Sequence, residues 1–202
     1  MPAPHHPKVS PGRWPVPAAA LVCLLLPAPL LAQTRGESDE GEVQVIASVA
    51  PVCVLGEPSE NVIDLGTLVD TSGPRIGRMA ALAARRITMP GSFCNYANTM
   101  ISVSASAMTE QTGAMLGTGF SRAVNYRVVV SPWAASEADL LTIAAADGSG
   151  PAGNAASASQ PLPRISDLTV ELSGFAAPSD ALLVAGEYSG LITVTLGPAT
   201  QF

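Results

Sequence analysis

Short runs in which apolar and polar residues alternate recur along this chain, and turn residues, mostly glycine and proline, separate them. The clearest runs are 43–49, 99–108, 124–130, 168–172 and 192–196. Alternation with a period of two places one side of an extended strand in a core and the other side in solvent. About seven or eight such strands predict an all-β fold, an antiparallel β-sandwich.

Two cysteines, Cys53 and Cys94, lie 41 positions apart at the ends of predicted strands. An even number of cysteines in an exported β-protein is most simply explained by disulfide bonding, so we expect one structural bond between them. A bond that closes a loop of this size should stabilise the fold by about 4 kcal/mol. A free reactive pair is the alternative, although neither cysteine lies in a Cys-x-x-Cys motif or beside a basic cluster.

Residues 1–32 have the layout of a secretory signal peptide, with a basic start at Lys8 and Arg13, an apolar stretch, and Ala32 before the expected cleavage point. The uninterrupted apolar run at 18–26 is shorter than the roughly 20 residues of a membrane-spanning helix. We therefore predict export to the periplasm, the cell surface or the extracellular space, and no membrane-spanning segment.

Residues 33–42 are polar and acidic without apolar periodicity, which predicts a flexible leader. The rest of the chain, 43–202, is predicted to form one sandwich domain. Within it, 62–68 is a further candidate strand. Residues 79–86 have good helix propensity, although the end of this segment could instead join a strand with 87–89. Residues 145–160 are almost entirely small or polar, which predicts a long exposed loop.

Composition excludes several kinds of chemistry. After removal of residues 1–32 the sequence holds no His or Lys, and eight arginines face sixteen carboxylates, for a net charge of −8. An acidic chain lacks the basic surface that nucleic-acid binding requires, so we expect no nucleic-acid partner. The lack of His and Lys excludes Ser-His-Asp triads, His-ligated zinc and Schiff-base catalysis. We predict a non-enzymatic protein without a cofactor or a metal.

A pair of carboxylates, as glycosidases use, is the remaining catalytic option. A sugar cleft also needs aromatic platforms, and the single tryptophan after the signal peptide, Trp133, follows Pro132 at the end of a predicted strand. We expect Trp133 to be a buried structural residue. The acidic leader lacks the glycine and distal glutamate of a calcium-binding loop, so we expect a solvated tail there.

The order of these features resembles that of a known family. A first strand ends at Cys53, the segment Val-Ile-Asp-Leu-Gly follows at 62–66, and Cys94 comes 41 residues after the first cysteine. The chain closes with Leu-Leu-Val-Ala-Gly-Glu-Tyr at 182–188 and Ile-Thr-Val-Thr-Leu at 192–196. This layout resembles the pilin-like superfamily, namely chaperone–usher fimbrial subunits and the spore coat protein U group.

The resemblance implies an incomplete immunoglobulin-like sandwich. In that family a periplasmic chaperone first supplies the missing edge strand, and the N-terminal extension of a like subunit then replaces it. Cys53 and Cys94 would form the family disulfide. The strand-accepting edge would consist of Leu191, Ile192, Val194 and Leu196, the last three of which would point inward.

The leader departs from the family pattern. A donor extension needs alternating apolar residues, and 33–42 has none; 43–49 could donate, but little would then remain for a first strand before Cys53. The chain then either accepts a strand without donating one, as a terminal subunit would, or completes its own fold.

Two functional hypotheses follow from the sequence. The first is a secreted, non-enzymatic structural subunit of a bacterial surface fibre or coat, assembled by β-strand complementation. The alternative is a self-complete secreted binding module or adhesin that acts as a monomer, with 145–160 or Trp133 as its contact candidates.

Overall fold

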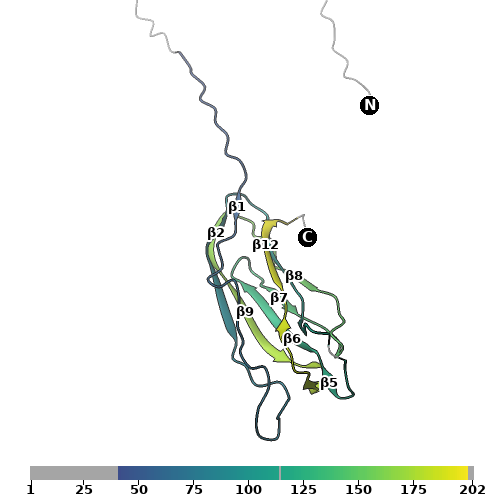
Figure 1. Ribbon diagram of the computed structural model, residues 1–202. Helices are drawn as coiled ribbons and strands as arrows, with labels where there is room; N and C mark the ends of the chain where they lie inside the picture. The colour runs from purple at the N-terminus through teal and green to yellow at the C-terminus, as the bar shows by residue number, and fades with distance from the viewer. Residues whose placement is uncertain (1–40, 114, 200–202) are drawn as a thin grey trace, which may run out of the picture. The chain divides into compact units, whose positions relative to one another are not determined.

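The computed structural model of this chain describes residues 41–113 and 115–199 (Figure 1). A compact unit begins at Ala47, and residues 41–46 belong to a separate unit. The predicted signal peptide and most of the predicted acidic leader lie outside the described residues.

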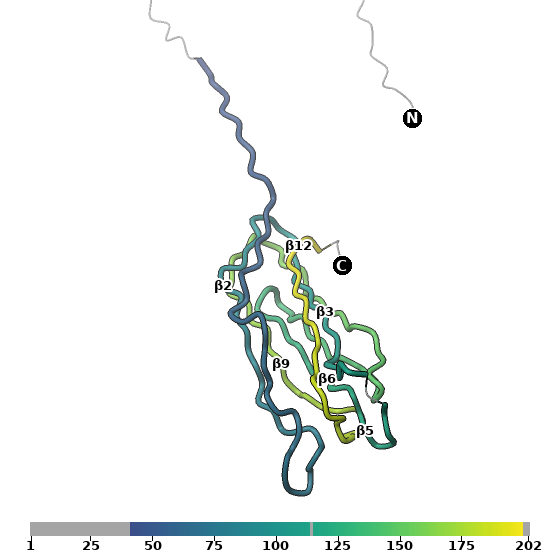
Figure 2. Tube along the Cα trace, in the orientation of Figure 1, coloured from purple at the N-terminus to yellow at the C-terminus, as the bar shows by residue number. Residues whose placement is uncertain are grey.

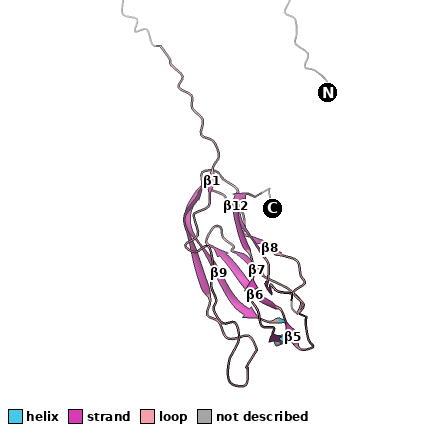
Figure 3. Ribbon diagram, in the orientation of Figure 1, coloured by secondary structure: helices cyan, strands magenta, loops and turns pink. Residues whose placement is uncertain are grey.

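Strands and their connections make up the described chain, with one helical turn at Pro178–Asp180 (Figure 3). The strands, in chain order, are β1 (Cys53–Val54), β2 (Arg85–Cys94), β3 (Thr99–Ala105), β4 (Met108–Glu110), β5 (Phe120–Ser121), β6 (Ala123–Ser131), β7 (Ala138–Leu141), β8 (Gly153–Ala156), β9 (Arg164–Ala176), β10 (Leu182–Leu183), β11 (Tyr188–Ser189) and β12 (Ile192–Pro198).

Most of these strands belong to two antiparallel sheets. The larger sheet has the order β1–β2–β9–β6–β4–β11, and β7 also pairs with β6. The smaller sheet has the order β12–β3–β8, so the last strand lies beside a strand far away in the sequence (Figure 2). β5 and β10 form a short parallel pair. The prediction of an all-β, antiparallel sandwich is therefore confirmed.

The period-two pattern places one side of each long strand in a shared core. In β3, for example, Ile101 and Val103 are buried while Ser102 and Ser104 between and after them remain half-exposed. The main core cluster draws on both sheets, and its members from β3, β6 and β9 are Ile101, Val103, Ala105, Tyr126, Val128, Val130, Leu168, Val170 and Leu172. Each valine, leucine or isoleucine buried in this way stabilises the fold by about 1.5–3 kcal/mol.

Trp133 is fully buried in this core, as the sequence predicted. Its indole Nε1 donates a hydrogen bond to Thr99 Oγ1 at 3.3 Å, which satisfies the polar edge of the ring. A side chain with no exposed surface offers no platform to a ligand, so Trp133 is not a contact residue of a binding module.

The predicted disulfide between Cys53 and Cys94 is present. The two residues lie directly opposite each other in the β1–β2 pair, with 4.1 Å between their Cα atoms. Because β1 has only two residues, the bond fixes the start of the sandwich to the end of β2.

The helix predicted at 79–86 is wrong, and the alternative, a strand that joins the end of this segment to 87–89, is confirmed. Residues 80–84 form a connection that is neither helix nor strand, and β2 begins at Arg85 and pairs with β9. On the outer face of this pair Arg86 donates a hydrogen bond of 2.5 Å to Glu171. The helix propensity of alanine is a weak preference, and ladder hydrogen bonds with burial on β9 outweigh it.

The strands predicted at 43–49 and 62–68 are also wrong. Residues 41–52 are neither helix nor strand, and the first strand begins at Cys53. The segment 62–68 has no strand either, although Ile63 and Leu65 are half-buried as a shared face would require. Alternation shows that a segment has two different sides, but a strand also needs a partner with which to pair.

The loop predicted at 145–160 is interrupted by a strand, β8, which pairs with β3. Small residues suit this place because the chain packs closely: a Cβ on Gly153 would lie 2.4 Å from Leu140 Cδ1. Ser157 is buried, and its hydroxyl accepts a hydrogen bond of 3.1 Å from the Ile101 amide. The small side chains therefore reflect close packing as well as exposure.

Replacement of Cys53 and Cys94 by alanine together should lower the free energy of unfolding by about 4 kcal/mol, because the unfolded chain loses a 41-residue constraint. Urea titrations of the oxidised protein and the double variant measure this difference. The reduced wild-type protein is the matched control and should unfold with the variant. A difference below about 1 kcal/mol would contradict the structural role of the bond.

Candidate functional site: an open strand edge beside an apolar groove

β12 is an edge strand. It pairs with β3 from Ile192 opposite Ala105 to Pro198 opposite Thr99. In the described part of the chain no strand pairs with its other edge. The backbone N–H and C=O groups along that edge are therefore available to a further strand.

The side chains of β12 alternate between two environments. Ile192, Val194 and Leu196 are half-buried and pack against the main core cluster. Thr193 and Thr195 are exposed on the other face of the small sheet. The apolar side of β12 thus faces the interior of the sandwich without being covered completely.

An apolar groove lies beside this edge. It has a volume of about 490 Å³, and Ile192 and Val194 form part of its lining. Its deeper lining comes from the large sheet, where Tyr126 stacks on Phe175 with 6.0 Å between ring centroids. The other lining residues from β2 and β9 are Ile87, Met89, Val170 and Leu172.

The opposite wall of the groove is the segment that follows β1. This segment runs along the free edge of β2, where the Gly56 amide donates to Ser92 Oγ at 2.9 Å and the Ser59 amide donates to the Thr88 carbonyl at 2.8 Å. From Pro58 to Leu65 the chain lines the groove, with Ile63 among its apolar contacts.

A second hollow of about 590 Å³ continues the groove. It is lined by 63–69 and 183–188, together with Met108. Both hollows share Ile63, Leu65, Met108 and Tyr188, so they form one extended depression beside the open edge. A mostly apolar groove beside an open strand edge suits an extended peptide better than a compact ligand.

Two tyrosine hydroxyls near the groove are held by backbone carbonyls. Tyr126 donates to the Ser106 carbonyl at 2.7 Å, and burial raises the pKa of Tyr126 to about 12. Tyr188 donates to the Val184 carbonyl at 2.8 Å, and burial is the main cause that raises its pKa. Both side chains are neutral at physiological pH, which keeps the groove apolar.

Glu110, the most buried carboxylate among the described residues, stabilises a turn. It accepts hydrogen bonds from the amides of Thr112 at 2.6 Å and Gly113 at 3.1 Å, and Arg122 lies 3.7 Å away. A carboxylate satisfied in this way is structural. Within 41–113 and 115–199 no group of three His, Cys, Asp or Glu residues could hold a metal ion.

The structure brings together part of the predicted strand-accepting edge. Ile192 and Val194 line the groove, and Leu196 packs on the core farther along β12. Leu191 precedes β12 and is 69% exposed at the rim. Tyr126 and Phe175 could not be recognised as groove residues from the sequence, because a period-two pattern indicates burial but not an unfilled space beside a side chain.

A second apolar feature lies outside the strands. In the run 43–49, Val43, Val45, Ile46 and Val49 are each more than 80% exposed. Four large apolar residues so close together are rarely left in water without a partner.

Comparison with family models, with curated proteins and with solved structures gives no match. The described residues also contain no helix that is both long enough and apolar enough to cross a membrane.

Removal of the Tyr126 hydroxyl should change how stability depends on alkaline pH. The folded state has the higher pKa, so the stability that neutral Tyr126 contributes is complete below about pH 10 and is lost as the pH rises toward 12. Tyr126→Phe should flatten this part of the profile and slightly lower stability at pH 7, because the bond to Ser106 is lost. Urea midpoints at pH 8, 10 and 11.5 measure the effect, and parallel profiles for both proteins would contradict it.

Proposed function

We propose that this protein is a secreted, non-enzymatic structural subunit of a bacterial surface fibre or coat, assembled by β-strand complementation. The observation that carries the proposal is the open edge of β12 beside an apolar groove. A strand added there would pair with the free backbone groups of β12 and cover Ile192 and Val194.

The physical case rests on two incomplete interactions at the same place. An exposed strand edge can pair with another chain, and natural proteins usually protect such edges with charge, proline or a bulge. Here the middle of the edge, 192–196, has no charged residue or proline. The half-buried apolar residues of β12 and the opposite wall would gain further burial from an inserted strand.

The donor that fits this edge is the segment 43–49 of a second copy. It has seven residues, as does β12, and seven extended residues span about 23 Å in both. Val43, Val45, Ala47 and Val49 fall on one side when the segment is extended. Each valine buried in the groove would stabilise the assembly by about 1.5–3 kcal/mol before the cost of ordering.

The acidic leader lacks the apolar residues of a donor strand, but the segment 43–49 that follows it has them. The sandwich begins at Cys53 and does not use 43–49 as a strand, so the segment is free to donate. One copy would then both accept and donate a strand, as a repeating fibre subunit must. Such head-to-tail contact is heterologous and does not close on itself, so it generates a linear polymer.

The proposal includes export of the chain and protection of its groove by a chaperone. The predicted signal peptide would direct the chain to the periplasm, where a chaperone strand would protect the groove until a like subunit replaced it. The monomeric binding module is the less supported function, because Trp133 is buried and β8 occupies part of the predicted contact loop.

Fibre formation should depend on the donor side chains that face the groove. The full chain, exported in its host, should give a detergent-resistant ladder on an unboiled gel that collapses on boiling. Val45→Glu should abolish the ladder, because a charge would enter an apolar groove. Gln44→Glu is the matched control, since it adds the same charge on the other side of the strand, and it should keep the ladder. A monomer band for the wild-type chain would overturn the proposal.

A variant with a blocked groove and a variant with a defective donor segment should pair with each other in only one orientation. Val194→Arg should block the groove, whereas Thr195→Arg on the exposed face should leave polymers intact. A mixture of Val194→Arg and Val45→Glu proteins should form one-to-one dimers that stop growing, because one groove and one donor segment remain functional. These dimers also show that both variants fold. Absence of dimers would contradict the assignment of donor and acceptor.

A further inference from the structure

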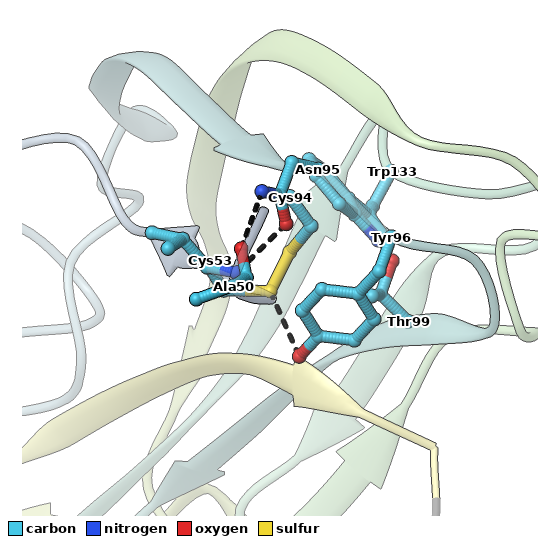
Figure 4. The surroundings of a disulfide bond; sticks show 8 residues. Ala50, Cys53, Cys94, Asn95, Tyr96, Thr99 and Trp133 are labelled. Carbon is cyan, nitrogen blue, oxygen red and sulfur yellow. Dashed lines mark hydrogen bonds between the residues drawn. A yellow bond between two sulfur atoms is a disulfide. The ribbon is translucent and has the colours of Figure 1, made fainter. Parts of the chain in front are cut away.

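The base of the donor segment is fastened to the sandwich by one side chain, Asn95, next to the disulfide (Figure 4). Its Oδ1 accepts a hydrogen bond from the Val52 amide at 2.7 Å, and its Nδ2 donates one to the Ala50 carbonyl at 2.9 Å. The Asn95 backbone amide donates a third bond to the Val52 carbonyl at 3.0 Å.

The Asn95 side chain acts here as an additional peptide group. A primary amide offers a donor and an acceptor in one plane, as a backbone peptide does. It extends the contacts of the β1–β2 pair outward past Val52 to Ala50, although no strand continues there. Pro51, between the two bonded residues, has no N–H to leave unpaired, and its ring fixes φ.

The disulfide keeps these contacts in place. Cys53 directly follows Val52, so its bond to Cys94 holds the backbone of 50–52 near Asn95 even when a hydrogen bond opens. A tethered group re-forms its contacts at a high effective concentration. The Tyr96 hydroxyl donates to Cys53 Sγ at 3.2 Å and so contacts the same junction from the core side.

We propose that Asn95 is a positioning residue of the joint between neighbouring subunits, where it fixes the direction in which the donor segment leaves its own domain. The inference rests on the proposed function. Only Ala50, Pro51 and Val52 separate the donor segment from Cys53, so rotation within these three residues is rotation between subunits. The Asn95 amide contacts two of the three, and proline stiffens the third.

Two variants separate the contributions of the amide. Asn95→Ala removes both side-chain bonds. Asn95→Asp keeps an acceptor for the Val52 amide but replaces the donor to the Ala50 carbonyl with an oxygen that repels it. Asn154→Ala is the matched control, because Asn154 is an exposed asparagine of β8, far from this junction in the β1–β2 and β3–β8 pairings.

The test combines a local and an assembled readout on the full exported chain. Amide exchange of Val52, measured in a Val45→Glu background that keeps the protein monomeric, should become about tenfold faster in Asn95→Ala and unchanged in Asn154→Ala. The urea midpoint of the sandwich should stay the same. In electron micrographs of fibres without the Val45 substitution, the persistence length should fall about twofold in Asn95→Ala and less in Asn95→Asp.

The outcomes distinguish this inference from the proposed function. Unchanged Val52 exchange in Asn95→Ala would overturn the positioning role, and so would fibres of unchanged stiffness. A lowered urea midpoint with unchanged stiffness would assign Asn95 to domain stability alone. If the wild-type chain forms no fibres, the proposed function fails and the joint fails with it, whatever the exchange rates show.

Discussion

Backbone hydrogen bonding decides which edges of this sandwich are complete. The free edge of β2 is covered without a full strand, because the segment after β1 follows it and places Ser59 opposite Thr88. The edge of β12 has no such cover among the described residues. The inward side chains of β12, Ile192, Val194 and Leu196, are therefore only half-buried, and an apolar groove lies beside this edge.

In this fold the disulfide compensates for a very short first strand. β1 has two residues, and a pair of that length adds few ladder hydrogen bonds. Covalent attachment of Cys53 to Cys94 therefore replaces the strand pairing that a longer first strand would provide. Residues 41–49 are exposed and belong to no strand, so the sandwich does not need its first alternating run.

Local patterning predicted the central strands because their partners lie in the same domain. The runs at 99–108, 124–130, 168–172 and 192–196 contain or overlap β3, β4, β6, β9 and β12. The helix expected at 79–86 failed since alanine favours a helix only slightly, and β9 offers the segment after Arg85 a ladder. The groove could not be foreseen, because no sequence pattern reports that the outer edge of β12 has no partner strand among the described residues.

The failure at 43–49 has a different cause from the failure at 79–86. This run alternates except at Ile46, yet it has no partner strand within the described residues. A pattern that contradicts the local structure is expected at functional sites. An alternating pattern stabilises a strand only where one side of that strand is buried. The edge of β12 has the same length as 43–49, and its apolar side chains face the groove. Under the proposed function, a strand pattern without a sheet and a sheet edge without a strand belong to neighbouring copies of one chain.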